Sequence, residues 1–86
     1  MYYMGKGAIC KAFGNEERLH IIACLRKPRC GKDLLARCSL SQSALSQHLK
    51  ILREAGVVTA RRSGKRIIYH ADAKAASIVG LLLSYK

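Results

Sequence analysis

The feature that most constrains this chain is a short helix followed, after a tight turn, by a longer helix. The short helix is predicted over residues 31–37, where apolar side chains recur at helical spacing at Leu34, Leu35 and Cys38. The longer helix is predicted over residues 42–55, because Ser41 is a preferred N-cap and Gly56 a preferred C-terminal stop. Two helices joined in this way have the organisation of a helix-turn-helix.

The longer predicted helix has two chemically different faces. At about 100° per residue, one arc carries Leu45, Leu49 and Leu52. His48 faces this arc, where we expect a partly buried imidazole with polar partners rather than a ligand. The opposite arc carries the polar residues Gln42, Ser43, Ser46, Gln47 and Lys50. A solvated helix face normally mixes Glu with Lys, yet no acid occurs from 42 to 53. An ordinary solvated face is the alternative, but the missing acids favour a surface that binds a polyanion.

A basic β-hairpin is predicted directly after this helix. Residues 57–60 and 66–70 are rich in β-branched and aromatic side chains, and the turn is expected near Ser63-Gly64. Its tip carries four cations, Arg61, Arg62, Lys65 and Arg66. Cations can simply protect an edge strand, but four so close together repel one another unless an anion lies between them. A helix-turn-helix followed by such a hairpin predicts a winged helix, mainly α with a small β-hairpin.

Three further helices complete the predicted order, α-α-α-α-β-β-α. One covers residues 8–13, a second begins at the N-cap Asn15 and ends before Pro28, and the last begins at the cap Asp72. Half of the residues are apolar, which is more than a monomeric domain of 86 residues can bury in its own core. We therefore expect one domain, 1–86, that forms a homodimer through its first and last helices, with an interface at Ile9, Phe13, Ile78, Val79, Leu82 and Leu83.

The charge of the chain indicates what it binds. Sixteen Lys and Arg against five Asp and Glu give a net charge of +11, which favours nucleic acid or an anionic membrane. The last helix lacks the basic polar face of a membrane-surface helix, and no run reaches the roughly 18 apolar residues of a membrane span. The residues typical of an active site are missing as well. Double-stranded DNA is the predicted partner; an RNA-binding or architectural nucleic-acid-binding module is the alternative, although the basic segments offer only Tyr69 for stacking on bases.

Two segments resemble the ArsR/SmtB-type winged-helix repressors. Residues 40–50 (LSQSALSQHLK) and 52–58 (LREAGVV) are similar to the recognition-helix signature of that family, and 62–69 is similar to its wing. Within the family, 41–49 is most similar to the branch of haemolysin-activator and biofilm-repressor proteins, which lack the usual metal box. The resemblance covers about residues 11–85. It implies a homodimeric repressor that binds inverted repeats in promoters.

The family's effector sites are not reproduced. The metal box of the sensing members matches Cys30-Gly31-Lys32-Asp33-Leu34, where Lys32 replaces the second thiolate, and the last helix has no His, Asp or Glu after Asp72. We therefore expect no metal and no cofactor. Cys10 and Cys30, meeting across two subunits, are the alternative thiolate site. Cys24 has no cysteine near the C-terminus to pair with, and we expect Cys24 and Cys38 to be small buried side chains. The effector is not predicted.

The first residues, Met1 to Gly7, lack the charged-then-apolar order of a signal peptide. We therefore expect a cytoplasmic protein whose cysteines are reduced.

Overall fold

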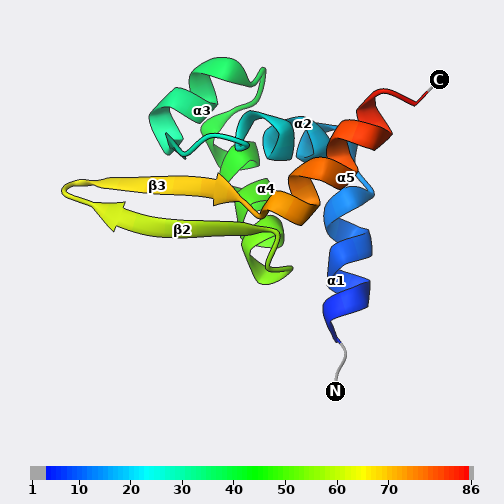
Figure 1. Cartoon of the computed structure of the whole chain (residues 1–86). Helices are drawn as coiled ribbons and strands as arrows, with labels where there is room; N and C mark the ends of the chain where they lie inside the picture. Colours follow the sequence, from blue (N-terminus) through cyan, green and yellow to red (C-terminus); the bar gives the residue numbers. More distant parts are fainter. Residues whose placement is uncertain (1–3, 86) are drawn as a thin grey trace.

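The computed structural model describes residues 4–85, with side chains from residue 7 onward. The helices and strands are α1 (Met4–Phe13), α2 (Glu16–Cys24), β1 (Arg29–Cys30), α3 (Gly31–Arg37), α4 (Gln42–Glu54), β2 (Val58–Ser63), β3 (Arg66–Ala71) and α5 (Ala73–Leu83). Figure 1 shows β2 and β3 projecting to one side of the molecule, while α1 and α5 lie at the opposite side. This is the predicted winged helix, and the predicted helix-turn-helix is α3 and α4.

The ends of the helices follow the predicted caps. The side-chain oxygens of Asn15, Ser41 and Asp72 accept hydrogen bonds from backbone N–H groups at the starts of α2, α4 and α5, at 3.0 to 3.1 Å. The helix α1 begins earlier than predicted, at Met4 rather than near residue 8. Gly5 and Gly7 lie in this first part of α1, but each glycine costs a helix only about 1 kcal/mol, too little to stop it.

The sheet contains one strand that the sequence did not indicate. In β2 and β3, Ser63 pairs with Arg66, so the turn is formed by Gly64 and Lys65. Gly64 has φ +63, a conformation that glycine adopts without steric cost. The additional strand, β1, pairs with β3 to give the order β1-β3-β2. Two residues are too short for a period-two pattern, so only the presence of β3 beside them makes this strand.

The core lies where α2, α4 and α5 meet the base of the hairpin. Its largest fully buried side chains are Ile21, Ile22, Leu25, Leu34, Leu52 and Val79. Val79 corrects the predicted interface, because it is 0% exposed inside its own subunit and has no surface to offer a second copy. The helix α5 packs on α2 through that side and leaves other large apolar side chains exposed, namely Ile78, Leu81, Leu82 and Leu83. Phe13, also predicted for the interface, is half-buried against the core.

No helix in the described part of the chain combines the length and the apolar character needed to cross a membrane.

We predict that Leu34→Ala lowers the free energy of unfolding by about 2–5 kcal/mol, because it leaves a cavity under the helix-turn-helix. Ile67→Ala on the exposed wing is the control, with an expected change within about 0.5 kcal/mol. Urea unfolding at one protein concentration measures both. Equal effects of the two substitutions would contradict the placement of Leu34 in the core.

Candidate nucleic-acid interface

The outward face of α4 is polar and accessible. Leu45, Leu49 and Leu52 are buried, and this fixes which side of the helix faces the solvent. The exposed side carries the five residues predicted to contact DNA: Gln42, Ser43, Ser46, Gln47 and Lys50. The first acid on this helix is Glu54, at its last residue. The second helix of the helix-turn-helix therefore presents an exposed surface of neutral polar side chains that ends in the positive charge of Lys50.

The cations of the wing do not all lie on one face. Arg61, Arg62, Lys65 and Arg66 are all exposed, as predicted for a basic hairpin tip. In β2, however, Arg61 is paired with the half-buried Ile68 and Arg62 with the exposed Ile67. Successive strand residues point to opposite faces of a sheet, so Arg61 and Arg62 lie on opposite faces of the wing. The basic charge therefore surrounds the wing.

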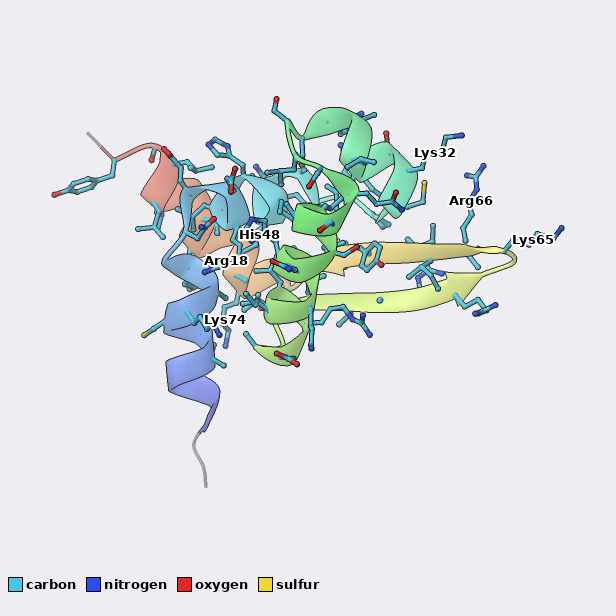
Figure 2. The ribbon with its side chains drawn as sticks, turned by 180° about the vertical axis from the view of Figure 1, so that it is seen from behind. Arg18, Lys32, His48, Lys65, Arg66 and Lys74 are labelled. Carbon is cyan, nitrogen blue, oxygen red and sulfur yellow. The ribbon has the colours of Figure 1, made fainter. Side chains whose placement is uncertain are left out.

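Lys32 is a cation near the wing that the sequence did not single out for nucleic-acid binding. It lies in the first turn of α3, and with Arg66 it lines a cavity of about 470 Å³ between α3 and the wing. Figure 2 shows Lys32 and Arg66 on the same side of the wing. The signal that could have identified it is in the sequence, because Lys32 places a cation where the metal box that this segment resembles has a thiolate.

The acid beside Lys32 is already paired. Asp33 accepts a hydrogen bond from Arg29 at 3.1 Å, and Arg37 lies 3.4 Å from its other oxygen. The hydrogen bond from Arg29 is the main cause that lowers the pKa of the Asp33 carboxyl below its ordinary value. Asp33 therefore stays ionised, with its charge balanced by Arg29 of β1 and Arg37 of α3, and the positive charges of Lys32 and Arg66 are not offset by it.

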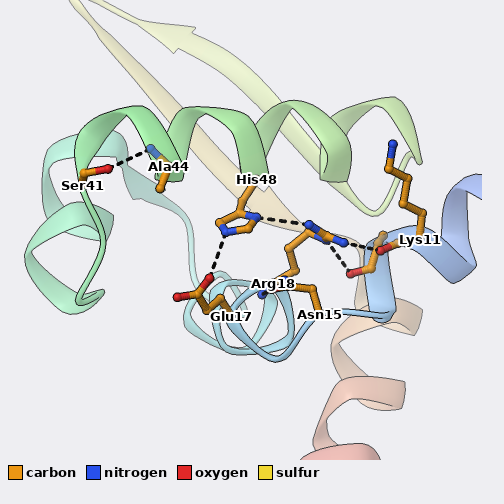
Figure 3. A network of polar contacts seen from close by, with 8 residues as sticks. Lys11, Asn15, Glu17, Arg18, Ser41, Ala44 and His48 are labelled. Atoms are coloured by element: carbon orange, nitrogen blue, oxygen red, sulfur yellow. Dashed lines mark hydrogen bonds and ion pairs between the residues drawn. The ribbon is translucent and has the colours of Figure 1, made fainter.

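His48 is a partly buried residue with polar partners, as predicted. Its Nδ1 lies 3.2 Å from the Arg18 guanidinium, and its Nε2 lies 3.2 Å from a carboxylate oxygen of Glu17. Both partners lie in the first turn of α2, so the contacts join α2 to the inner side of α4 (Figure 3).

The cysteines are free in the described structure. Cys10 is exposed, Cys30 is half-buried, and Cys24 and Cys38, predicted to be buried, are half-buried and pack against the edge of the core. Cys24 and Cys38 also line one cavity of about 270 Å³. Burial raises the pKa of the Cys38 thiol above its ordinary value, and the neighbouring Cys24 thiol raises it further. Within residues 4–85, no three His, Cys, Asp or Glu side chains are grouped in a way that can hold a metal ion.

Comparison with known proteins bears on this interface. Residues 15–60 match the family model described as "Bacterial regulatory protein, arsR family". The chain is 41% identical over 75 residues to the HTH-type transcriptional repressor SmtB of Mycobacterium tuberculosis, an alignment that covers 85% of this chain and 56% of that protein. This chain thus spans just over half the length of that curated relative.

Solved structures are similar over almost the whole fold. HlyU from Vibrio cholerae is 35% identical with a TM-score of 0.79, covering 91% of this chain and 87% of that one. The transcriptional repressor BigR from Xylella fastidiosa is 32% identical with a TM-score of 0.80, covering 92% and 83%. The residues 15–60 that match the family model include the helix-turn-helix, α3 and α4.

We predict that Cys38 is alkylated more slowly in the folded protein than in the same protein unfolded in guanidinium chloride. Its raised pKa leaves less thiolate at pH 7.5, and each unit of pKa means about tenfold less thiolate at that pH. The ratio of the two rates should approach one as the pH rises, because both states then become thiolates. Mass spectrometry after pulses of iodoacetamide measures the rates, and the exposed Cys10 is the internal control. Equal folded and unfolded rates for Cys38 at pH 7.5 would contradict this.

Proposed function

Because the chain belongs to the ArsR family of bacterial regulatory proteins, we propose that it is a transcriptional regulator that binds double-stranded DNA. The observation that carries this proposal is the exposed face of α4, which has no acid before Glu54 and lies beside a basic wing. We propose a repressor that occupies promoter DNA. SmtB and BigR are described as repressors, whereas HlyU of Vibrio cholerae is described as an activator.

In this proposal α4 enters the major groove. Gln47 is the principal base-reading residue, because its amide can form two hydrogen bonds with adenine. Ser43 and Ser46 contact base edges or phosphates, and Gln42 lies at the start of the same face. Lys50 lies late on the helix, where its ammonium group meets the phosphate backbone.

The wing holds the backbone beside the groove that α4 occupies. Cations on both faces of the hairpin suit a tip that lies between two phosphate strands, because each face then meets one of them. In this arrangement Arg61 and Arg62 bind opposite strands, and Lys65 binds at the turn. Lys32 and Arg66 add a further phosphate contact at the edge of α3.

Two copies bind together in the proposed complex, since one recognition helix reads too few base pairs to select a promoter. The exposed apolar side chains of α1 and α5 supply the interface: Ile9, Ile78, Leu81, Leu82 and Leu83. These helices lie opposite the wing, so a pair joined there directs its two wings outward (Figure 1).

RNA is the weaker candidate. Readers of single-stranded RNA stack bases on exposed aromatic rings, whereas Tyr69, the aromatic residue of the wing, is half-buried against the core. The relatives described above are transcriptional regulators, which gives no support to an RNA-binding module or to an enzyme.

We predict that selection from a random pool of duplexes yields an inverted repeat, and that Gln47→Ala weakens binding to it by about 1–3 kcal/mol with little effect on random DNA. Arg62→Ala should weaken both duplexes and lower the slope of log affinity against log salt by about one. Fluorescence anisotropy measures both. Equal loss on both duplexes for Gln47→Ala would show that this residue does not read bases.

We predict that Leu82→Glu gives monomers in sedimentation and loses operator binding, because it places a charge within an apolar interface. Ile67→Glu on the wing makes the same kind of change at a similarly exposed position and should leave the dimer intact. A parent protein that sediments as a monomer at micromolar concentration would refute the dimer.

A further inference from the structure

Arg18 lies where three helices meet, although it belongs to neither the DNA-contacting surface nor the exposed apolar surface. Its Nη2 donates to the carbonyl oxygen of Lys11 at 2.7 Å, and its Nε donates to that of Ala12 at 3.3 Å. Both carbonyls are in the last turn of α1, where helix carbonyls lack partners within the helix and a cation is favoured. The third contact of the guanidinium is His48 of α4 (Figure 3).

Only one assignment of donors and acceptors is consistent with these contacts. A guanidinium can donate but not accept, so Nδ1 of His48 must be the acceptor of the bond from Arg18. The ring hydrogen of a neutral imidazole is then on Nε2, which donates to the Glu17 carboxylate. Along Arg18, His48 and Glu17, every hydrogen-bond donor therefore faces an acceptor.

The position of His48 connects this chain of contacts to the recognition face. His48 follows Gln47 directly on α4, and its side chain is only 14% exposed, on the inner side of the helix. The leucines beside it set which side of α4 faces inward, but they do so through apolar packing, which is not directional. The contact with Arg18 is directional, and it ties the middle of α4 to the end of α1.

We propose that Arg18 and His48 are positioning residues for DNA recognition, which hold α4 in the orientation that lets its outer face read bases. The inference rests on the proposed function, because it assigns a role to residues behind the surface that binds DNA. It goes further in assigning part of the operator selectivity to a chain of polar contacts that touches no DNA. Since α1 supplies part of the proposed dimer interface, the same contacts join that interface to the recognition helix.

The test compares Arg18→Met and His48→Leu, which remove the polar groups and keep much of the side-chain volume, with the double variant. Anisotropy on the selected operator and on a random duplex is the measurement. Each single variant should lose about tenfold in operator affinity, the cost of one broken, partly buried charged hydrogen bond. The double variant should lose less than the product of the two single losses, because both changes break the shared Arg18–His48 contact.

Two matched controls separate the loss of the proposed positioning role from the mere loss of an arginine or a histidine. Arg26→Met removes an exposed arginine, and His20→Leu removes an exposed histidine of α2. Both controls should stay within about twofold of the parent on the operator, as expected for surface changes. Random-duplex affinity should fall no further in Arg18→Met than in Arg26→Met, since each loses one positive charge.

Two milder variants keep the test decisive if His48→Leu does not fold. His48→Gln retains one acceptor and a donor and should recover most of the operator affinity, which a role in packing alone does not predict. Glu17→Ala removes an acceptor that is 55% exposed, so the fold should persist while operator affinity falls by about threefold. Sedimentation should show dimers for every variant.

Several outcomes would overturn the inference. It fails if Arg18→Met and His48→Leu both bind the operator within about twofold of the parent, or if their losses add in the double variant. It also fails if operator and random DNA lose affinity equally beyond the Arg26→Met control. If Gln47→Ala loses operator affinity and these variants do not, only the positioning role is wrong; if the parent selects no duplex, the proposed function fails as well.

Discussion

The burial of one face of α4 is the constraint on which the rest of the structure depends. Leu45, Leu49 and Leu52 must leave water, and they do so in a core to which α1, α2, α5 and the base of the hairpin also contribute. Burying these leucines on one side necessarily presents Gln47 and its polar neighbours on the other. In the same fold, α3 packs against β3 and the last part of α4 packs against β2, so the wing lies beside the recognition helix. A change that rotated α4 would expose leucines and bury glutamine and serine, so packing and the recognition surface are determined together.

The electrostatic design is uneven in a way that suits a polyanion. Two of the five acids have side-chain partners: Asp33 forms ion pairs with Arg29 and Arg37, and Glu17 accepts a hydrogen bond from His48. Among the residues that the structure describes, none of the cations of α4 or the wing, nor Lys32, forms an ion pair. Repulsion among them costs free energy in the unbound protein, and the strand pairing of the wing holds them together despite it. That cost is relieved when phosphates lie between the cations.

The two ends of the domain serve different contacts, and polar groups connect them. The wing and the outer face of α4 form one surface, and the apolar residues of α1 and α5 form another. Between them, Arg18 bonds to the last turn of α1 and to His48 of α4. Polar contacts at such a junction fix direction as well as distance, which apolar packing does not.

The sequence by itself determined the elements and their faces, because helix caps, helical periodicity and strand composition are local properties. Asn15, Ser41 and Asp72 marked three helix starts correctly, and the leucine arc of α4 assigned its exposed residues. Only the tertiary structure decided what depends on neighbours distant along the chain. The strand β1 exists because β3 lies beside it, and Val79 is in the core because α5 packs on α2 through that side. Packing between distant segments also places Lys32 beside the same cavity as Arg66 and Cys24 beside the same cavity as Cys38. It likewise brings Arg18 into contact with His48. Periodicity along one segment reports which side is apolar, but which group lies opposite is set by packing between segments that no local pattern records.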